Sequence, residues 1–254
     1  MNYLHALILA IVEGVTEFLP VSSTAHLILA GKLMQLQETN FLKSFDIAIQ
    51  LGAILAVMSI WFRRLLKDRE LIKRVLFAFL PTGVIGLVLY KLIKTFLLSN
   101  TKVIVWSLLL GGIALVIFEY LHKEDAKEEE TQHISYKQAF GIGLFQALAV
   151  IPGVSRSAST ILGGMLLGLR RKTAVEFSFL VAIPTMGAAV ALDLFKSAPA
   201  FSSDQMGIML FGCAISFLVA LLSVKALTAF VRSHTFVVFG FYRIILALAL
   251  LWIL

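Results

Sequence analysis

Long apolar runs alternate with short polar segments along the whole chain. A helix needs about 20 apolar residues to cross the hydrocarbon core of a membrane. Six runs have about this length, and each predicts a membrane-spanning helix: Ser44–Phe62, Val75–Leu98, Val103–Leu121, Ala174–Phe195, Met206–Leu227 and Thr235–Leu254. We therefore expect an all-α integral membrane protein.

Four further apolar stretches are too short to span a membrane: Tyr3–Val12, Ala25–Leu36, Gln138–Ile151 and Ala158–Gly168. They fall into two pairs, and a polar segment with a proline separates the members of each pair. We call these segments the first break (Glu13–Thr24) and the second break (Pro152–Ser157). Each pair predicts a re-entrant helix-loop-helix. Non-helical backbone at membrane depth is tolerated only where protein or a water-filled cavity satisfies its polar groups.

The two breaks align when the chain is shifted against itself by 133 residues, which places Glu13 on Gln146 and Ser22 on Ser155. Each half then contains one re-entrant hairpin and three spans, and the odd number of crossings inverts the second half. We predict a single membrane domain, 1–254, made of a first repeat (1–121), a cytoplasmic connecting loop (122–137) and an inverted second repeat (138–254). Such repeats place their site near the membrane midplane.

Composition and charge agree with a membrane protein. The hydrophobic share is 59%, against roughly 45–50% in soluble domains. The net charge of +7 lies in short loops, so we expect membrane lipids and no nucleic acid as partners. Lys and Arg number 13 on one predicted side and 6 on the other, which predicts that both termini lie outside. The 13 basic residues lie in Arg63–Arg74, His122–Lys137, Arg170–Lys172 and Ala229–His234.

The first break carries two acids four residues apart, Glu13 and Glu17. On a helix they share one face, with Cβ atoms about 5–6 Å apart. Two carboxylates this close in a low dielectric require either a shared proton or a cation between them. We therefore predict a divalent metal site at Glu13 and Glu17, for Mg²⁺ or Ca²⁺. Two glutamates in an aqueous vestibule are the less favoured alternative, because charges at this depth are costly.

The same break continues into the start of a new helix. Pro20 is expected to end the first helix, because it donates no backbone hydrogen bond. Ser22, Ser23 and Thr24 are residues that favour the helix N-cap, and a helix N-terminus binds anions. His26 lies about one turn further on, so the segment has the residue types for a nucleophile and a base. Simple capping and a structural histidine are the alternatives.

The second break repeats the hydroxyl-rich helix start but places Arg156 where the first break has Ser23. The planar guanidinium suits a phosphate held by two hydrogen bonds. An ion pair with Glu13 or Glu17 is the alternative, and both roles are compatible. Gln50 is the mid-span polar residue expected near the cavity. Other ionisable residues near spans are expected to be interfacial or in structural pairs: Asp46, Glu119, Glu176, Asp193, Lys225 and Arg243.

Three strings, Glu13–His26, Pro152–Thr160 and Glu176–Met186, closely resemble the undecaprenyl-diphosphate phosphatase family of bacteria, of the bacitracin-resistance type. The resemblance covers essentially the whole chain. It implies hydrolysis of undecaprenyl diphosphate to undecaprenyl phosphate and inorganic phosphate in the bacterial inner membrane. Recycling of the lipid carrier for wall synthesis and resistance to bacitracin would follow. It also implies a divalent cation and functional roles for Glu13, Glu17, Ser23, His26, Ser155, Arg156 and Thr160.

The expected mechanism assigns roles to five residues. Ser23 attacks the terminal phosphorus, and His26 or Glu17 takes its proton. Glu13 and Glu17 hold the metal, while Arg156 stabilises the transition state. Direct attack by water or by His26 stays open. Residues expected to contact the prenyl diphosphate are Ser22, Thr24, Gln50, Ser155, Ser157 and Thr160.

Two rival functions fit parts of the pattern. Acid-phosphatase-type lipid phosphatases carry a histidine six residues after the arginine of their Ser-Arg motif, where this chain has Leu162, so that class is disfavoured. A transporter or flippase for an anionic lipid is the second rival, because inverted repeats with broken helices are typical of transporters. The sequence leaves the oligomeric state open, a homodimer included.

Overall fold

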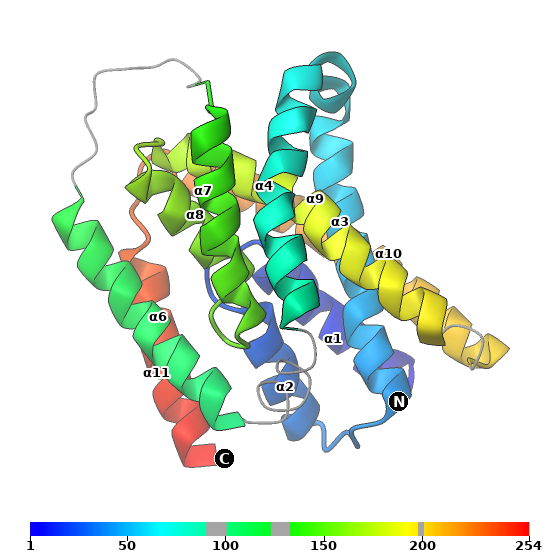
Figure 1. The fold of residues 1–254 in the computed structure, drawn as a ribbon. Coiled ribbons are helices and arrows are strands. Elements are labelled where there is room, and N and C mark those ends of the chain that lie inside the picture. Colours follow the sequence, from blue (N-terminus) through cyan, green and yellow to red (C-terminus); the bar gives the residue numbers. More distant parts are fainter. Residues whose placement is uncertain (90–100, 123–132, 198–200, 254) are drawn as a thin grey trace.

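The computed structural model describes residues 1–89, 101–122, 133–197 and 201–253, and within these ranges every regular element is a helix (Figure 1). Five described helices are long and apolar enough to cross a membrane. They are α3 (Asn40–Lys67), α4 (Arg69–Val88), α6 (Thr101–Leu121), α9 (Arg171–Ser197) and α10 (Ser203–Phe230). The prediction of a multi-pass, all-α membrane protein is confirmed at this level.

The predicted spans differ from the helices mainly at their ends. α4 begins six residues before its predicted start, at Arg69, where Asp68 caps it through the backbone N–H of Leu71. Residues 90–98 of that prediction and most of the predicted loop 122–137 lie outside the described residues. The sixth predicted span corresponds to α11 (Val237–Ile253), a 17-residue helix that is shorter than the other five.

Two pairs of short helices occupy the predicted re-entrant positions. The first pair is α1 (Tyr3–Thr16) and α2 (Ser23–Leu33). The second pair is α7 (Tyr136–Ala147), with the 3₁₀ turn η2 (Leu148–Val150) after it, and α8 (Arg156–Leu166). At about 1.5 Å per residue, none of these helices crosses a hydrocarbon core of about 30 Å.

The end of α1 differs from the prediction that Pro20 terminates it. The helix stops at Thr16, and Glu17 is its C-cap. A proline excludes helical backbone at the residue before it, so the chain must leave the helix ahead of Pro20, and residues 17–21 form a turn. Glu17 therefore lies where the helix opens into the first break.

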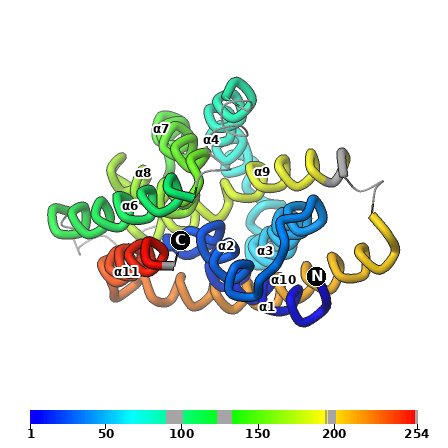
Figure 2. Tube along the Cα trace, turned by 90° about the horizontal axis from the view of Figure 1, so that it is seen from below, coloured from blue at the N-terminus to red at the C-terminus, as the bar shows by residue number. Residues whose placement is uncertain are grey.

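Each hairpin packs its first helix against a long span from the other half of the chain. α1 lies along α10, and α7 lies along α4. Glycines permit both contacts: a side chain at Gly14 would run into Val219 and the Ser216 carbonyl, and one at Gly143 would run into the Ala78 carbonyl. α3 packs on α9 and α10, and α6 packs on α11. Seen from below, α2 lies near the middle, beside the α6–α11 pair (Figure 2).

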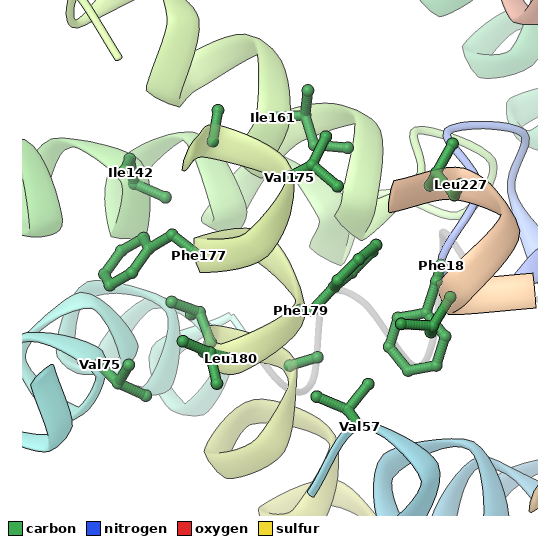
Figure 3. Close-up of a cluster of buried hydrophobic side chains, with 14 of the residues drawn as sticks. Phe18, Val57, Val75, Ile142, Ile161, Val175, Phe177, Phe179, Leu180 and Leu227 are labelled. Atoms are coloured by element: carbon green, nitrogen blue, oxygen red, sulfur yellow. The ribbon is translucent and has the colours of Figure 1, made fainter. Parts of the chain in front are cut away.

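A buried aromatic pair fixes the first break onto the main core. Phe18, next to Glu17, is fully buried and meets Phe179 of α9 edge to face, with ring centroids 5.4 Å apart. Val57 of α3 and Leu227 of α10 belong to the same cluster (Figure 3). Close van der Waals packing drives the association of helices within a membrane, so this cluster holds the Glu17 backbone in place.

Two of the ionisable residues predicted near spans form ion pairs, and Arg243 does not. Glu119 pairs with Arg171 at 2.8 Å and Glu176 pairs with Arg64 at 3.4 Å, as structural pairs were predicted to do. Arg243 of α11 contradicts the prediction of an interfacial or ion-paired residue. It is 0% exposed and donates hydrogen bonds at 3.0–3.4 Å to five backbone carbonyls, those of Pro20, Ser107, Leu108, Gly153 and Val154.

The bonds of Arg243 join the first break, the second break and α6. A side chain at Gly111 of α6 would run into the guanidinium, so glycine leaves the space that the arginine fills. Carbonyl groups of irregular backbone have no water to bind inside a membrane. One arginine therefore satisfies carbonyls of both breaks and sets their spacing.

We expect Arg243→Ala to lower the melting temperature in detergent strongly, or to prevent folding. Each buried carbonyl left without a donor costs about 1–3 kcal/mol. The exposed Arg232, in the turn after α10, supplies the matched control. Arg232→Ala should change stability by no more than about 0.5 kcal/mol. Equal melting temperatures for the two variants would contradict the assigned role of Arg243.

Candidate active site

A cavity of about 200 Å³ lies where the two breaks meet. Most of its polar lining was predicted from the sequence, and its lining residues come from both halves of the chain. They are Glu17, Ser22, Ser23, Thr24, Gln50, Ala149, Pro152, Gly153, Ser155, Arg156 and Met186. A liquid water occupies about 30 Å³, so the space suits a phosphate-sized headgroup rather than a long lipid chain.

A short hydrogen bond joins Glu17 to Ser23, the candidate catalytic serine. The Ser23 hydroxyl donates to Glu17 Oε2 at 2.6 Å, and both residues are buried. Glu17 follows α1 and Ser23 begins α2, so the turn between the helices brings them together. A carboxylate in this position orients the hydroxyl and can accept its proton, which is the arrangement of an activated nucleophile.

Arg156 brings the second break to the same carboxylate. Its Nη2 donates to Glu17 Oε1 at 3.0 Å, and its Nη1 donates to the Ser178 carbonyl at 2.9 Å. The guanidinium also lies over the Phe18 ring, 5.6 Å from its centroid. The ion pair that the sequence left open is therefore present. The Nε–H is buried and has no hydrogen-bond partner, so the side chain keeps a donor for a ligand.

Ser157 and Thr160 lie behind the cavity wall rather than in it, although both were predicted to contact substrate. The Ser157 hydroxyl donates to the Leu19 carbonyl at 2.7 Å, which ties the two breaks together. Thr160 Oγ1 donates to the Arg156 carbonyl at 2.9 Å and lies 2.6 Å from the Ser178 hydroxyl. These two residues hold the Arg156 segment in place. Neither residue is among those that line the cavity.

Two helix N-termini adjoin the cavity, and each follows a serine with left-handed backbone. The φ angles are 70° at Ser22 and 77° at Ser155, a conformation uncommon outside glycine. Ser155, predicted as a substrate contact, caps its helix by accepting from the Ala158 N–H at 3.2 Å. Ser22 makes no side-chain cap, contrary to the capping alternative, and lines the cavity instead. First-turn amides at such helix starts favour an anion.

Glu13 lies deeper than Glu17 and outside the cavity lining. It is 0% exposed, and neither carboxylate oxygen has a hydrogen-bond partner. An ionised carboxylate buried in this way is costly without a counter-charge. Within the described ranges, no group of three or more His, Cys, Asp and Glu side chains is close enough to hold a metal ion. Both oxygens of Glu13 are thus available to a cation or a proton.

His26 does not face the cavity, although it was predicted as a catalytic residue. Its Nδ1 donates to the Ser22 carbonyl at 2.7 Å, and its Nε2 lies 2.7 Å from the Tyr242 hydroxyl. Both ring nitrogens are therefore occupied, and His26 is not among the lining residues. Of the two proton acceptors that the sequence left open for Ser23, the structure places Glu17 within hydrogen-bond distance.

Sequence reasoning missed several residues of the site. Met186 lines the cavity with its sulfur 3.7 Å from Arg156 Nη2, and Ser178 anchors the same arginine. Both lie within the Glu176–Met186 string. A serine inside an apolar span was the sequence feature that could have pointed to Ser178. Thr24 and Gln50 line the cavity as predicted.

This fold and site define a multi-pass membrane protein. The residues needed for phosphoryl transfer lie at one cavity between its two pairs of short helices. The family model of the bacitracin resistance protein BacA matches residues 6–249. The chain belongs to this family, and the resemblance seen in its motifs is confirmed.

Curated relatives match along essentially their whole length. An undecaprenyl-diphosphatase of Aquifex aeolicus is 51% identical over 248 residues, which cover 98% of this chain and 97% of the relative. Another, from a Sulfurihydrogenibium species, is 47% identical with 98% of each chain covered. The undecaprenyl-diphosphatase of Wolinella succinogenes is 46% identical and covers 100% of this chain and 99% of its own.

We expect Arg156→Lys to lower turnover by about two orders of magnitude or more while the protein still folds. An ammonium supplies a point charge where the guanidinium positions several donors at once. Turnover per folded molecule should be measured beside Lys67→Arg, a cation exchange at an exposed residue outside the cavity lining. Near-wild-type turnover of Arg156→Lys would contradict phosphate binding by the Arg156 guanidinium and leave it the role of a structural ion-pair partner.

Proposed function

We propose that this protein hydrolyses undecaprenyl diphosphate to undecaprenyl phosphate and inorganic phosphate. The observation that carries the proposal is the Ser23–Glu17–Arg156 arrangement, in which one carboxylate holds a nucleophile and an arginine at the cavity. The names of the relatives support the same activity. Recycling of the lipid carrier for wall synthesis, and bacitracin resistance, follow from this reaction.

The proposed reaction has two steps. Ser23 Oγ attacks the terminal phosphorus as Glu17 takes its proton, and the bond between phosphorus and the bridging oxygen breaks. Undecaprenyl phosphate leaves and a phosphoserine remains. Glu17 gives its proton to an oxygen of the departing undecaprenyl phosphate and is again a carboxylate. It then takes a proton from the water that attacks the phosphoserine, the bond between phosphorus and Ser23 Oγ breaks, and Glu17 returns the proton to Ser23 Oγ as inorganic phosphate is released. Arg156 and the helix N-termini stabilise negative charge on the phosphoryl oxygens in both steps.

We further propose that Glu13 and Glu17 hold a divalent cation, Mg²⁺ or Ca²⁺. The buried, unpartnered oxygens of Glu13 fit the hard oxygen ligands that these ions prefer. Mg²⁺ commonly binds through one or two carboxylates plus substrate phosphates and water, so a small protein ligand set is compatible with it. When bound, the cation would neutralise charge on the diphosphate.

The architecture that we propose is an inverted repeat, 1–121 and 138–254, in the inner membrane of a bacterium. The left-handed serines Ser22 and Ser155 lie 133 residues apart, before helices of 11 residues each. The reciprocal packing of α1 on α10 and α7 on α4 supports the repeat. Figure 1 shows both termini at one end of the molecule, opposite the α3–α4 turn. With the excess of basic residues near that turn, this arrangement favours termini outside the cell.

The first test measures phosphate release from a prenyl diphosphate by purified protein in detergent. We expect turnover with Mg²⁺ and loss of turnover in chelator. Glu13→Gln should need more metal for half-maximal rate, while the exposed Glu38→Gln should behave as wild type. Full turnover in chelator would contradict the cation. Absence of phosphate release, combined with movement of the lipid between vesicle leaflets, would instead indicate a flippase.

The second test separates the two serines at the start of α2. Ser23→Ala should lower kcat by about three orders of magnitude or more, because the nucleophile is removed. Ser22→Ala should lose much less, since its hydroxyl lines the cavity without touching Glu17. Kinetics of the two variants form a matched pair. An inactive Ser22→Ala with an active Ser23→Ala would contradict the assigned nucleophile.

A further inference from the structure

The strained turn before each re-entrant helix is held by a side chain four residues later. In the second break, the Ser155 carbonyl accepts from the backbone N–H and from the hydroxyl of Ser159, both at 3.0 Å. In the first break, the Ser22 carbonyl accepts from the His26 backbone N–H at 3.4 Å and from His26 Nδ1 at 2.7 Å. The bond from the backbone N–H is the longer of the two, so the imidazole makes the closer contact with the Ser22 carbonyl.

His26 and Ser159 are equivalent positions, because they are 133 residues apart. A serine hydroxyl is a poor base at neutral pH, so the shared role of the two residues is a hydrogen bond to a strained carbonyl. Left-handed backbone at a non-glycine residue costs about 1–3 kcal/mol and persists only where its surroundings enforce it. At Ser22, the shorter of the two described hydrogen bonds to its carbonyl comes from the imidazole.

Tyr242 of α11 fixes the imidazole. A carbonyl only accepts, so Nδ1 carries the proton, and Nε2 of the neutral ring accepts from the Tyr242 hydroxyl at 2.7 Å. The two rings are stacked, with an interplanar angle of 5° and centroids 5.6 Å apart. The next residue, Arg243, donates to the Pro20 carbonyl at 3.3 Å. Two successive residues of α11 thus hold the first break from either side of Ser22.

We propose that His26 and Tyr242 act as a positioning pair for Ser23. His26 holds the left-handed turn from which α2 starts, Tyr242 holds the tautomer and plane of the imidazole, and Glu17 is the proton acceptor. The inference rests on the proposed phosphatase function. It assigns a role to Tyr242, which lies outside the three sequence strings, and it removes His26 from proton transfer.

The test compares steady-state kinetics of His26→Ser, His26→Ala, Tyr242→Phe and the double variant His26→Ser/Tyr242→Phe. His26→Ser copies the arrangement at Ser159, so it should keep kcat within about tenfold of wild type, with KM little changed. His26→Ala lacks the donor and should lose about a hundredfold. Tyr242→Phe should lose several-fold in the wild-type background and nothing further beside His26→Ser, because interacting residues are not additive. Tyr120→Phe, an exposed tyrosine on α6, is the control.

The outcomes separate this inference from the proposed function. No phosphate release by the wild type would reject the phosphatase itself. With an active wild type, a loss in His26→Ser as deep as that in His26→Ala would overturn the positioning role. A removed general base costs about 10²–10⁴ in rate whichever residue replaces it. If His26→Ala does not fold, a hundredfold loss in folded His26→Ser still overturns the proposal. So does an undiminished effect of Tyr242→Phe beside His26→Ser.

Discussion

The arrangement of the site depends on one buried guanidinium. Arg243 donates to carbonyls of both breaks and of α6 at membrane depth, where irregular backbone has no water to satisfy it. Two of these carbonyls, those of Pro20 and Gly153, lie 133 residues apart, which is the spacing of the proposed repeat. Without this donor, the carbonyls of Pro20, Gly153 and Val154 would lose the hydrogen bonds that Arg243 gives them. With it, both stay irregular, and their cavity stays open and polar.

The charges around the cavity follow from that constraint. Glu17 and Arg156 come from different breaks and pair at 3.0 Å once the breaks are held together. Arg243 is satisfied by backbone carbonyls and takes no carboxylate among its hydrogen bonds. Glu13 is left with two buried, unpartnered oxygens. Two kinds of buried group thus stay without a hydrogen-bond partner among the described residues, the acceptors of Glu13 and the donor Nε–H of Arg156.

Local patterns predicted the parts of the structure that depend on local physics. Apolar run length gave the spans and the short hairpins, and proline with clustered hydroxyls located the breaks. The cost of charge at depth singled out Glu17 and Arg156, and the hydroxyl-rich helix start singled out Ser23. The resemblance of the motifs to a known family added the substrate. These predictions needed only neighbours within a few residues.

Contacts between distant segments could not be predicted in the same way. The partners of Arg243 are up to 223 residues away, and Tyr242 meets His26 across 216 residues. His26 was therefore predicted as a possible base for Ser23, whereas in the structure its ring points to Tyr242. Ser157 and Thr160 were predicted as substrate contacts. The rotation of α8 decides which way they point, and that rotation is set by packing on α9 and on the first break, which the local sequence does not show.

The central claim is that both halves build one phosphoryl-transfer site around Ser23. The most direct measurement is an experimental structure of the protein with vanadate, which adopts the geometry of a transferring phosphoryl group. The account predicts vanadium bonded to Ser23 Oγ, with Arg156 donating to its oxygens and Glu17 beside the serine. Vanadate bonded to His26, or held by the first break with Arg156 turned away, would contradict it.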